Sequence, residues 1–205
     1  MRLNHGGKIS GEGVGKSTQL SRLAAVLREQ GRDVAVTREP GGTPGAEAIR
    51  ALLLDPATTL DPLADTLLVF AVRADHVRRM IRPALTRCAV VLCDRFTDST
   101  MAYQGHGLGV DRAAIKVLAR IIGLKPDLTI ILDAPPEVAR ERLAARGSSP
   151  DRYERFDAGF AAKVAEGFRS IATAEPERCV LIDASGPADA IAAVIANLVR
   201  QKLFE

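Results

Sequence analysis

The run Gly-Glu-Gly-Val-Gly-Lys-Ser-Thr at residues 11–18 constrains the fold of this chain more than any other feature. A glycine-rich turn that leads directly into a helix points several backbone N–H groups at one spot, and the helix dipole adds positive potential there. Lys16 can reach the β- and γ-phosphates of a nucleotide, and the Ser17 hydroxyl can bind the Mg²⁺ that they carry. We therefore interpret this run as a phosphate-binding loop rather than an ordinary surface turn. The loop comprises Gly11, Glu12, Gly13, Val14, Gly15, Lys16, Ser17 and Thr18.

The loop departs from the usual pattern at its first position. The pattern G-x-x-x-x-G-K-[ST] expects glycine at residue 10, where this chain has Ser10. The preceding residues are also unusual, because only Met1, Leu3 and Ile9 are apolar among the first ten. A strand buried on both faces is normally an almost continuous apolar run. We therefore expect a defective first strand immediately before the loop.

Short apolar runs alternate with helical patterns along the rest of the chain. The predicted strands are Val34–Val36, Val90–Cys93, Leu128–Leu132 and Val180–Ile182. The predicted helices are Ser17–Gln30, Gly45–Leu54, Asp61–Thr86, Asp111–Ile122, Pro136–Arg146, Ala158–Ala174 and Pro187–Leu203. This alternation predicts an α/β fold with a five-stranded parallel sheet that helices cover on both faces. No repeat or linker interrupts it, so we expect residues 1–205 to form a single three-layered domain.

Composition limits the classes of function. The net charge of +3 and the absence of tryptophan do not suit a nucleic-acid-binding surface. No apolar run approaches the roughly 18 to 20 residues of a membrane span, and the N-terminus lacks the apolar core of a secretory signal. Cys88, Cys93 and Cys179 lack metal-ligand spacing, and their odd number argues against a disulfide framework. We expect a cytoplasmic protein with no nucleic-acid or membrane partner, in which Cys93 and Cys179 are small buried side chains.

Charged residues follow three of the predicted strands. Arg38 and Glu39 follow one strand, Asp94 and Arg95 the next, and Asp133 another. Ligands of parallel α/β sheets bind outside the carboxyl ends of the strands, so we expect these residues beside the phosphate-binding loop. Asp94 is placed to hold Mg²⁺, although a helix cap or an ion pair with Arg95 would also use this residue. Arg38 and Arg95 suit a second phosphate group, which predicts phosphoryl transfer between two nucleotides.

Three segments resemble bacterial thymidylate kinases. They are Arg38–Thr43 (REPGGT), Phe70–His76 (FAVRADH) and Asp94–Gly105 (DRFTDSTMAYQG), and the likeness extends from Gly11 to about Ala184. The resemblance implies a P-loop nucleoside monophosphate kinase fold. It also implies Mg²⁺-dependent transfer of the γ-phosphoryl group of ATP to thymidine monophosphate (dTMP), giving ADP and dTDP in dTTP biosynthesis. The members of the family tend to be homodimers.

The same resemblance assigns the binding site for the acceptor base and sugar. Phe70 would stack on thymine and Arg73 would bind its O4, although Phe70 also fits ordinary core packing. Tyr103 would lie close to the sugar C2′ and exclude a ribose hydroxyl. Ser99 and Gln104 would belong to the same pocket wall.

Three charged residues are assigned to the acceptor phosphate and sugar. By the resemblance, Arg38 and Arg95 hold the 5′-phosphate of dTMP, and Arg95 and Lys16 count among the catalytic residues. Glu12 would approach either the 3′-hydroxyl of the acceptor sugar or the Arg38 guanidinium. We interpret His76 as a packing or hydrogen-bonding histidine rather than a proton shuttle, because phosphoryl transfer needs little acid–base help.

Residues 146–155 combine turn-forming residues with several arginines. We interpret this segment as a short lid that closes over ATP. Some family members carry a basic residue at the position of Gly13; in members that have glycine there, as this chain does, the lid supplies the catalytic arginine. Arg146 or Arg152 would then neutralise charge on the γ-phosphoryl group, although each arginine also fits a solvated surface loop. Arg142 would flank the adenine.

The segment before Gly11 departs from the family pattern. Thymidylate kinases usually carry an apolar strand that ends in a sequence such as Phe-Glu-Gly at this point, whereas this chain passes from Ser10 directly to Gly11. A local deletion or an error in the reported sequence would give the same pattern. A deletion predicts weaker ATP binding and lower stability, with the acceptor pocket intact. Two alternatives stay open: a kinase of this fold for another nucleoside monophosphate, and a nucleotide-binding protein that is inactive or weakly active.

Overall fold

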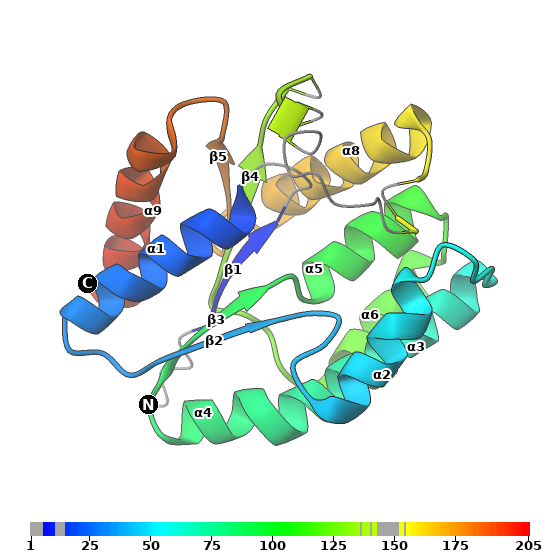
Figure 1. Cartoon of the computed structure of the whole chain (residues 1–205), viewed down its shortest axis with the longest axis horizontal. Helices are drawn as coiled ribbons and strands as arrows, with labels where there is room; N and C mark the ends of the chain where they lie inside the picture. Colours follow the sequence, from blue (N-terminus) through cyan, green and yellow to red (C-terminus); the bar gives the residue numbers. More distant parts are fainter. Residues whose placement is uncertain (1–5, 11–14, 136, 140, 143–151, 154) are drawn as a thin grey trace.

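Five parallel strands form one sheet in the order β2-β3-β1-β4-β5 (Figure 1). The computed structural model describes residues 6–10 (backbone only), 15–135, 137–139, 141–142, 152–153 and 155–205. The strands are β1 (Gly6–Ser10), β2 (Val34–Arg38), β3 (Val90–Asp94), β4 (Leu128–Asp133) and β5 (Cys179–Asp183). The α/β fold predicted from alternating strands and helices is thereby confirmed.

The first strand lies in the centre of the sheet despite its composition. Gly7 of β1 pairs with Leu92 of β3 on one side and with Leu128 of β4 on the other. The strand that the sequence predicts to be defective is therefore formed, with parallel neighbours on both sides. It leads towards residues 11–14, which lie outside the described residues.

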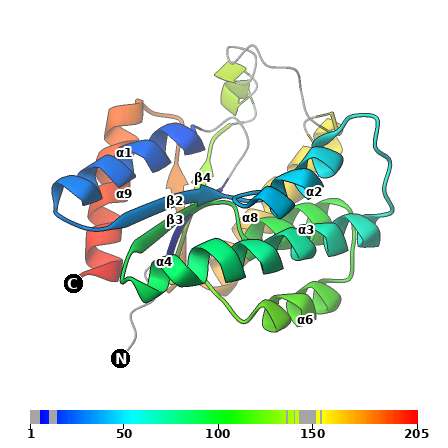
Figure 2. The ribbon, with the colours of Figure 1, turned by 60° about the horizontal axis from the view of Figure 1, so that its bottom comes forward.

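Helices lie on both faces of the sheet. The regular helices are α1 (Lys16–Glu29), α2 (Pro44–Leu54), α3 (Pro62–His76), α4 (Arg82–Thr86), α5 (Thr97–Thr100), α6 (Arg112–Ile122), α8 (Ala158–Ala174) and α9 (Ala188–Leu203). Helices α1 and α9 lie side by side over one face (Figure 1). The view in Figure 2 shows α3, α4 and α8 on the other side of the sheet, with α6 outside α3; α2 packs against α3.

Side-chain caps explain where several helices begin. Thr43 accepts a hydrogen bond from a backbone N–H in the first turn of α2, and Asp61, Asp111 and Asp157 do the same for α3, α6 and α8. Such caps satisfy N–H groups that have no partner inside the helix. Threonine and aspartate at these positions therefore fix the helix starts.

Alternate side chains of the strands enter two different cores. Val90 and Leu92 of β3 pack in a cluster with residues of α1 and α9, whereas Val91 and Cys93 pack with residues that include Val77. This alternation follows from the two-residue period of a strand, and it explains why the predicted strands are almost continuously apolar. Cys93 and Cys179 are buried, as their positions beside apolar runs predicted.

The long helix predicted over Asp61–Thr86 is divided into three pieces. A π-helical stretch, η1 (Val77–Ile81), separates α3 from α4. Pro83, in the turn that follows, cannot donate a backbone hydrogen bond. The wider turns of the π-helical stretch accommodate the missing hydrogen bond. A second π-helical stretch, η2 (Met101–Gly107), continues α5 at a position where the sequence predicted no helix.

Two predicted segments fall mainly on residues that the structure does not describe. These are the helix Pro136–Arg146 and the lid at residues 146–155. Within the lid, only residues 152, 153 and 155 are described. Among the described residues, no helix has the length and apolar character that crossing a membrane requires.

Candidate functional site

A cleft of about 650 Å³ opens at the carboxyl ends of the strands. Its walls come from the first turn of α1, the segments after β2 and β3, α3, α5 and η2, and the start of α9. Residues predicted from the sequence account for much of its lining: Gly15, Lys16, Ser17, Thr18, Arg38, Arg73, Asp94, Arg95, Ser99, Tyr103, Gln104 and Arg142. Parallel strands place their carboxyl ends on one edge, so residues distant in sequence gather there.

The N-terminus of α1 forms one end of the cleft. Gly15 precedes the helix with φ of 86°, a left-handed conformation that favours glycine. Lys16 is largely buried, whereas Ser17 and Thr18 are exposed to the cleft. The unpaired N–H groups and the positive dipole end of a helix attract anions. The remaining loop residues, at 11–14, lie outside the described residues, so their contribution stays a prediction.

Glu47 of α2 orients Arg38 at the end of β2. Arg38 Nη2 lies 2.9 and 3.1 Å from the two carboxylate oxygens of Glu47. The Gly42 N–H donates to the same carboxylate at 2.9 Å. These contacts hold the pKa of Glu47 below its ordinary value, chiefly through the Gly42 N–H and also through the charge of Arg38. Arg38 therefore stands in a defined position beside the cleft, held by an acid that the sequence analysis did not identify.

A buried network surrounds Arg73 on α3. Arg73 Nε donates to Glu39 Oε2 at 2.8 Å, and Arg73 Nη2 donates to Thr100 Oγ1 at 3.0 Å. His76 is fully buried and bonds Glu39 through Nδ1 at 3.0 Å and Thr37 through Nε2 at 2.7 Å. The interpretation of His76 as a hydrogen-bonding histidine is confirmed. The sequence placed Glu39, which joins the two side chains, at the end of a strand beside the cleft, but not its pairing with Arg73, which lies 34 residues away in the sequence.

One guanidinium nitrogen of Arg73 makes no hydrogen bond to the described residues. Arg73 Nη1 is buried and has no hydrogen-bond partner among the residues that the structure describes. Buried donors are almost always paired in folded proteins. Because Arg73 lines the cleft, its unpaired N–H is suited to an acceptor atom of a ligand.

Asp94 presents an unpaired oxygen at the end of β3. Its Oδ1 atom is buried without a hydrogen-bond partner in the described part of the chain, and both Asp94 and Ser17 line the cleft. Carboxylate and hydroxyl oxygens are ligands that Mg²⁺ prefers, so these residues fit such an ion. The described residues contain no cluster of three or more His, Cys, Asp or Glu that could hold a metal by itself. An ion here would therefore depend on additional oxygen ligands, such as phosphates.

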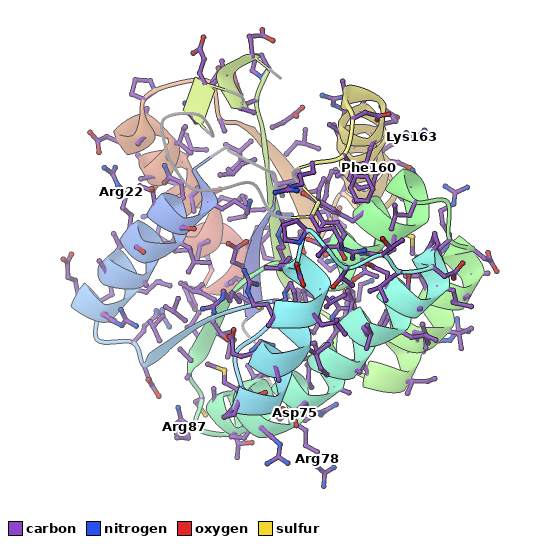
Figure 3. The ribbon with its side chains drawn as sticks, turned by 45° about the vertical axis from the view of Figure 1, so that its right-hand side comes forward. Arg22, Asp75, Arg78, Arg87, Phe160 and Lys163 are labelled. Carbon is purple, nitrogen blue, oxygen red and sulfur yellow. The ribbon has the colours of Figure 1, made fainter. Side chains whose placement is uncertain are left out.

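Arg95 follows Asp94 in an uncommon backbone conformation. Its φ of 69° lies in the left-handed region that most residues avoid, and such strain often occurs at functional sites. The Arg95 guanidinium lies 4.7 Å from the centre of the Tyr103 ring. Tyr103 in turn makes edge contacts with Tyr153 and with Phe160, which projects inward from α8 (Figure 3). The aromatic cluster therefore fixes Tyr103 beneath the arginine.

Phe70 is buried and does not line the described cleft, whose apolar wall includes Val69 and Phe96 instead. The Arg73 guanidinium lies 4.8 Å from the centre of the Phe70 ring and 5.1 Å from that of Phe96. Stacking of Phe70 on a base therefore stays a prediction, and its burial fits the core-packing alternative.

Arg152 is held away from the cleft lining. Its Nε donates to the Leu53 carbonyl at 2.8 Å, and its Nη2 pairs with Asp65. Neither Asp65 nor Tyr153, which also bonds Asp65, was identified from the sequence. Arg146 lies outside the described residues. The catalytic roles of both lid arginines stay predictions.

Arg142 closes the opposite part of the cleft. Its Nη1 donates to the Ala184 carbonyl at 2.8 Å, and its Nη2 lies 3.5 Å from the Gly186 carbonyl. The structure therefore joins Arg142, which the resemblance placed beside the adenine, to the turn after β5.

Comparison with known proteins decides the family. The family model described as thymidylate kinase matches residues 11–195. This chain belongs to the thymidylate kinase family. The thymidylate kinase of Caulobacter vibrioides is 50% identical over 196 residues, which cover 94% of each chain. The thymidylate kinase of Deinococcus radiodurans is 46% identical over 193 residues and 93% of each chain.

A solved structure gives the same result for the fold. The crystal structure of thymidylate kinase from Ehrlichia chaffeensis superposes with a TM-score of 0.79 at 33% identity, covering 95% of this chain and 97% of that one. The resemblance to thymidylate kinases is thus confirmed, together with a P-loop nucleoside monophosphate kinase fold. The thymidylate kinase family match begins at residue 11, so it leaves out the unusual segment of β1.

Proposed function

We propose that this chain transfers the γ-phosphoryl group of ATP to dTMP, giving ADP and dTDP in dTTP biosynthesis. The observation that carries the proposal is a single cleft with a helix N-terminus for phosphates at one end and the unpaired Arg73 N–H at the other. The two curated relatives described above are named thymidylate kinases, and the match covers almost their full length. This similarity supports the same activity.

The donor nucleotide would bind at the α1 end of the cleft. Backbone N–H groups of residues 11–18 and the Lys16 ammonium would hold the β- and γ-phosphates. Arg142 would flank the adenine. Ser17 and Asp94 would hold Mg²⁺, which neutralises phosphate charge and orients the transferring group when it is bound.

The acceptor nucleotide would bind between β2, α3 and η2. Arg38 and Arg95 would hold the 5′-phosphate of dTMP, because guanidinium groups match phosphate oxygens. Arg73 would donate from Nη1 to O4 of thymine. Tyr103 would pack against the sugar at C2′. Ser99, Gln104 and Phe70 would complete the pocket, and Glu12 would approach the 3′-hydroxyl or Arg38.

Catalysis would come from positioning and charge neutralisation. Two bound nucleotides bring the attacking phosphate oxygen and the γ-phosphoryl group together, which removes much of the entropic cost of reaction. Lys16, Arg95 and either Arg146 or Arg152 would then stabilise the charge on the transferring group. We propose that residues 146–155 form the lid that brings its arginine over ATP, within a single domain spanning residues 1–205.

We further propose a cytoplasmic homodimer. Leu63 and Leu67 lie one turn apart on α3 and are 49% and 48% exposed. Val117 and Ile121 lie one turn apart on α6 and are 44% and 73% exposed. Helices α3 and α6 contact each other, so these side chains offer an apolar surface that a second copy would cover.

Product analysis tests the proposed activity. The purified chain is incubated with MgATP and dTMP, and the nucleotides are separated by anion-exchange chromatography. We expect dTDP and ADP in equal amounts. Lys16→Met should abolish both products, whereas Lys163→Met, at an exposed position on α8 (Figure 3), should leave them unchanged. ADP without dTDP would contradict the proposal.

The departure at Ser10 favours one second candidate, a nucleotide-binding protein with little or no turnover. Ser10 lacks the conformational freedom of the glycine that the loop pattern expects. Such a protein would still be stabilised by dTMP in a melting experiment but would form no dTDP. The same chromatography therefore separates the two candidates.

A further inference from the structure

Asp65 is a buried carboxylate to which the mechanism above gives no role. It lies in the first turn of α3, and its side chain is 1% exposed. Carboxylates are almost never buried so completely unless they are paired and hydrogen-bonded. The partners of Asp65 come from two distant parts of the chain: Gln104 on η2, and Arg152 and Tyr153 ahead of α8.

These partners fill both oxygens of the Asp65 carboxylate. The Arg152 guanidinium pairs with Oδ2 and balances the buried charge. The Tyr153 hydroxyl lies 2.8 Å from Oδ1 and 2.9 Å from Oδ2 and donates its single hydrogen to the carboxylate. Gln104 Nε2 donates to Oδ1 at 2.8 Å. Asp65 therefore joins α3 to the wall of the cleft.

The contact with Asp65 fixes which way the Gln104 amide faces. A carboxylate only accepts hydrogen bonds, so the amide NH₂ group must face Asp65. Gln104 Nε2 also lies 3.2 Å from the Tyr153 hydroxyl oxygen, which accepts its second hydrogen. The amide oxygen Oε1 is then turned away from both, and no described residue donates a hydrogen bond to it. Because Gln104 lines the cleft, Oε1 is an acceptor available to a ligand.

The cleft wall thus offers one hydrogen-bond donor and one hydrogen-bond acceptor to the base of the nucleotide that receives the phosphoryl group. The donor is Arg73 Nη1, which is buried and unpaired among the described residues, and the acceptor is Gln104 Oε1. A 4-oxo pyrimidine such as thymine or uracil carries a carbonyl oxygen at C4 beside an N3–H. Cytosine carries an amino group at C4 beside an N3 lone pair, so its hydrogen-bonding pattern is reversed.

We propose that Asp65 is a positioning residue for base selection. By fixing the Gln104 amide, Asp65 makes Oε1 accept the N3–H of a 4-oxo pyrimidine and face the N3 lone pair of cytosine unfavourably. Reversed polarity leaves buried polar groups unpaired, and this is the strongest means of rejecting a wrong ligand of similar size. The inference rests on the proposed function, because it requires the acceptor base to bind beside Arg73.

The test compares dUMP with dCMP, which differ only at the edge in question. The ratio of their kcat/KM values is measured for the unchanged protein and for Asp65→Asn. An asparagine has both a donor and an acceptor, so it no longer dictates the direction of the Gln104 amide. We expect this ratio to fall about tenfold or more, as the loss of one discriminating hydrogen bond predicts. The change should appear mainly in the KM of the acceptor, with the KM of ATP unchanged.

Tyr153→Phe is the matched control. It removes a hydroxyl from the same network but keeps the bond between Asp65 and Gln104, so the ratio of dUMP to dCMP should be retained. A folded Asp65→Asn protein whose ratio stays within about twofold overturns the proposal. A merely structural role of Asp65 would lower the melting temperature and would lower kcat equally for all acceptors. The ratio of the kcat/KM values for dUMP and dCMP would then be unchanged.

Two further measurements keep the test decisive. If Asp65→Asn does not fold, Asp65→Asn combined with Arg152→Gln removes both charges of the buried pair and is assayed in its place. In addition, calorimetry on the unchanged protein compares dTMP with N3-methyl-dTMP in the absence of ATP, and equal affinities would overturn the proposal. If the unchanged protein neither binds nor phosphorylates dTMP, the proposed function itself fails.

Discussion

The buried ion pair between Arg73 and Glu39 is the residue-scale feature on which the acceptor pocket depends most. Their side chains are 2% and 3% exposed. Removing one partner of such a pair leaves a buried charge uncompensated, which typically costs about 3–5 kcal/mol. We predict that Glu39→Gln lowers the free energy of unfolding by roughly this amount and weakens dTMP binding, because Arg73 loses its orientation. Urea unfolding and calorimetric titration with dTMP measure the two effects.

Glu177→Gln is the control for that prediction. Glu177 pairs with Lys202 but is 96% exposed, so the loss of its charge should change stability by less than about 0.5 kcal/mol. Equal losses of unfolding free energy in Glu39→Gln and Glu177→Gln would contradict the prediction that the buried Arg73–Glu39 pair contributes more to stability than an exposed pair.

Also at the residue scale, His106 predicts a pH dependence of stability. Its pKa lies below the ordinary value of 6.5, chiefly because of burial and secondly because of the positive charge of Arg112. The folded state therefore disfavours the protonated imidazole. The contribution of neutral His106 to stability is complete above the unfolded pKa of 6.5. It is lost as the pH falls through the lower folded-state pKa.

We therefore expect the melting temperature to fall as the pH is lowered from 6.5 through the folded-state pKa of His106, and to fall less in His106→Gln. The carboxylates whose pKa is lowered, such as Asp75 and Glu175, lose their contribution as the pH falls below their ordinary pKa values of 3.8 and 4.5, so the onset of the His106 effect at pH 6.5 lies above them. Identical slopes for the two proteins across this pH range would contradict the assignment to His106.

At the scale of elements, β1 combines a central place in the sheet with a poor composition. Its sequence is GGKIS, yet it is paired with β3 and β4 along its length. Inserting Phe-Glu-Gly after Ser10 would restore the usual family sequence. One additional buried apolar side chain contributes roughly 1.5–3 kcal/mol, so we predict a higher melting temperature and tighter ATP binding. Inserting Ser-Glu-Gly controls for length, and no gain from either insertion would contradict the expected defect.

The elements also show what could be predicted from the sequence. Apolar runs such as Val90–Cys93 identify strands because both faces of the sheet are covered, and the residues just after them mark the cleft. The π-helical stretch η2 left no periodic signal, since its turns are wider than the 3.6-residue pattern. Strand β1 was recognised chiefly because the glycine-rich loop requires a strand before it.

The charged networks could not be predicted because they depend on tertiary contact. Glu39 is 34 residues from Arg73, and Asp65 is 87 residues from Arg152. The strand-end position of Glu39 predicts that it lies near the cleft, but nothing in the local sequence pairs it with Arg73 or distinguishes Asp65 from a solvated surface residue. Motifs therefore supplied the groups that face the cleft, whereas the structure was needed to find the acids that hold them.

On the scale of the whole molecule, the apolar surface of α3 and α6 predicts the oligomeric state. Ile121→Asp places a charge on the most exposed of the large apolar side chains named above. We expect size-exclusion chromatography with light scattering to show a dimer for the unchanged protein and a monomer for this variant. Val194→Asp, at a 51% exposed position on α9, should remain a dimer. Dissociation by both variants, or by neither, would contradict an interface on α3 and α6.

The central claim concerns the whole cleft, a kinase site specific for dTMP. The most direct measurement is the rate of ADP release from ATP with dTMP, dUMP, dCMP and AMP as acceptors, with and without Mg²⁺. We predict Mg²⁺-dependent release that is fastest with dTMP and slow with dCMP and AMP. Release that is independent of the acceptor, or fastest with AMP, would contradict the claim.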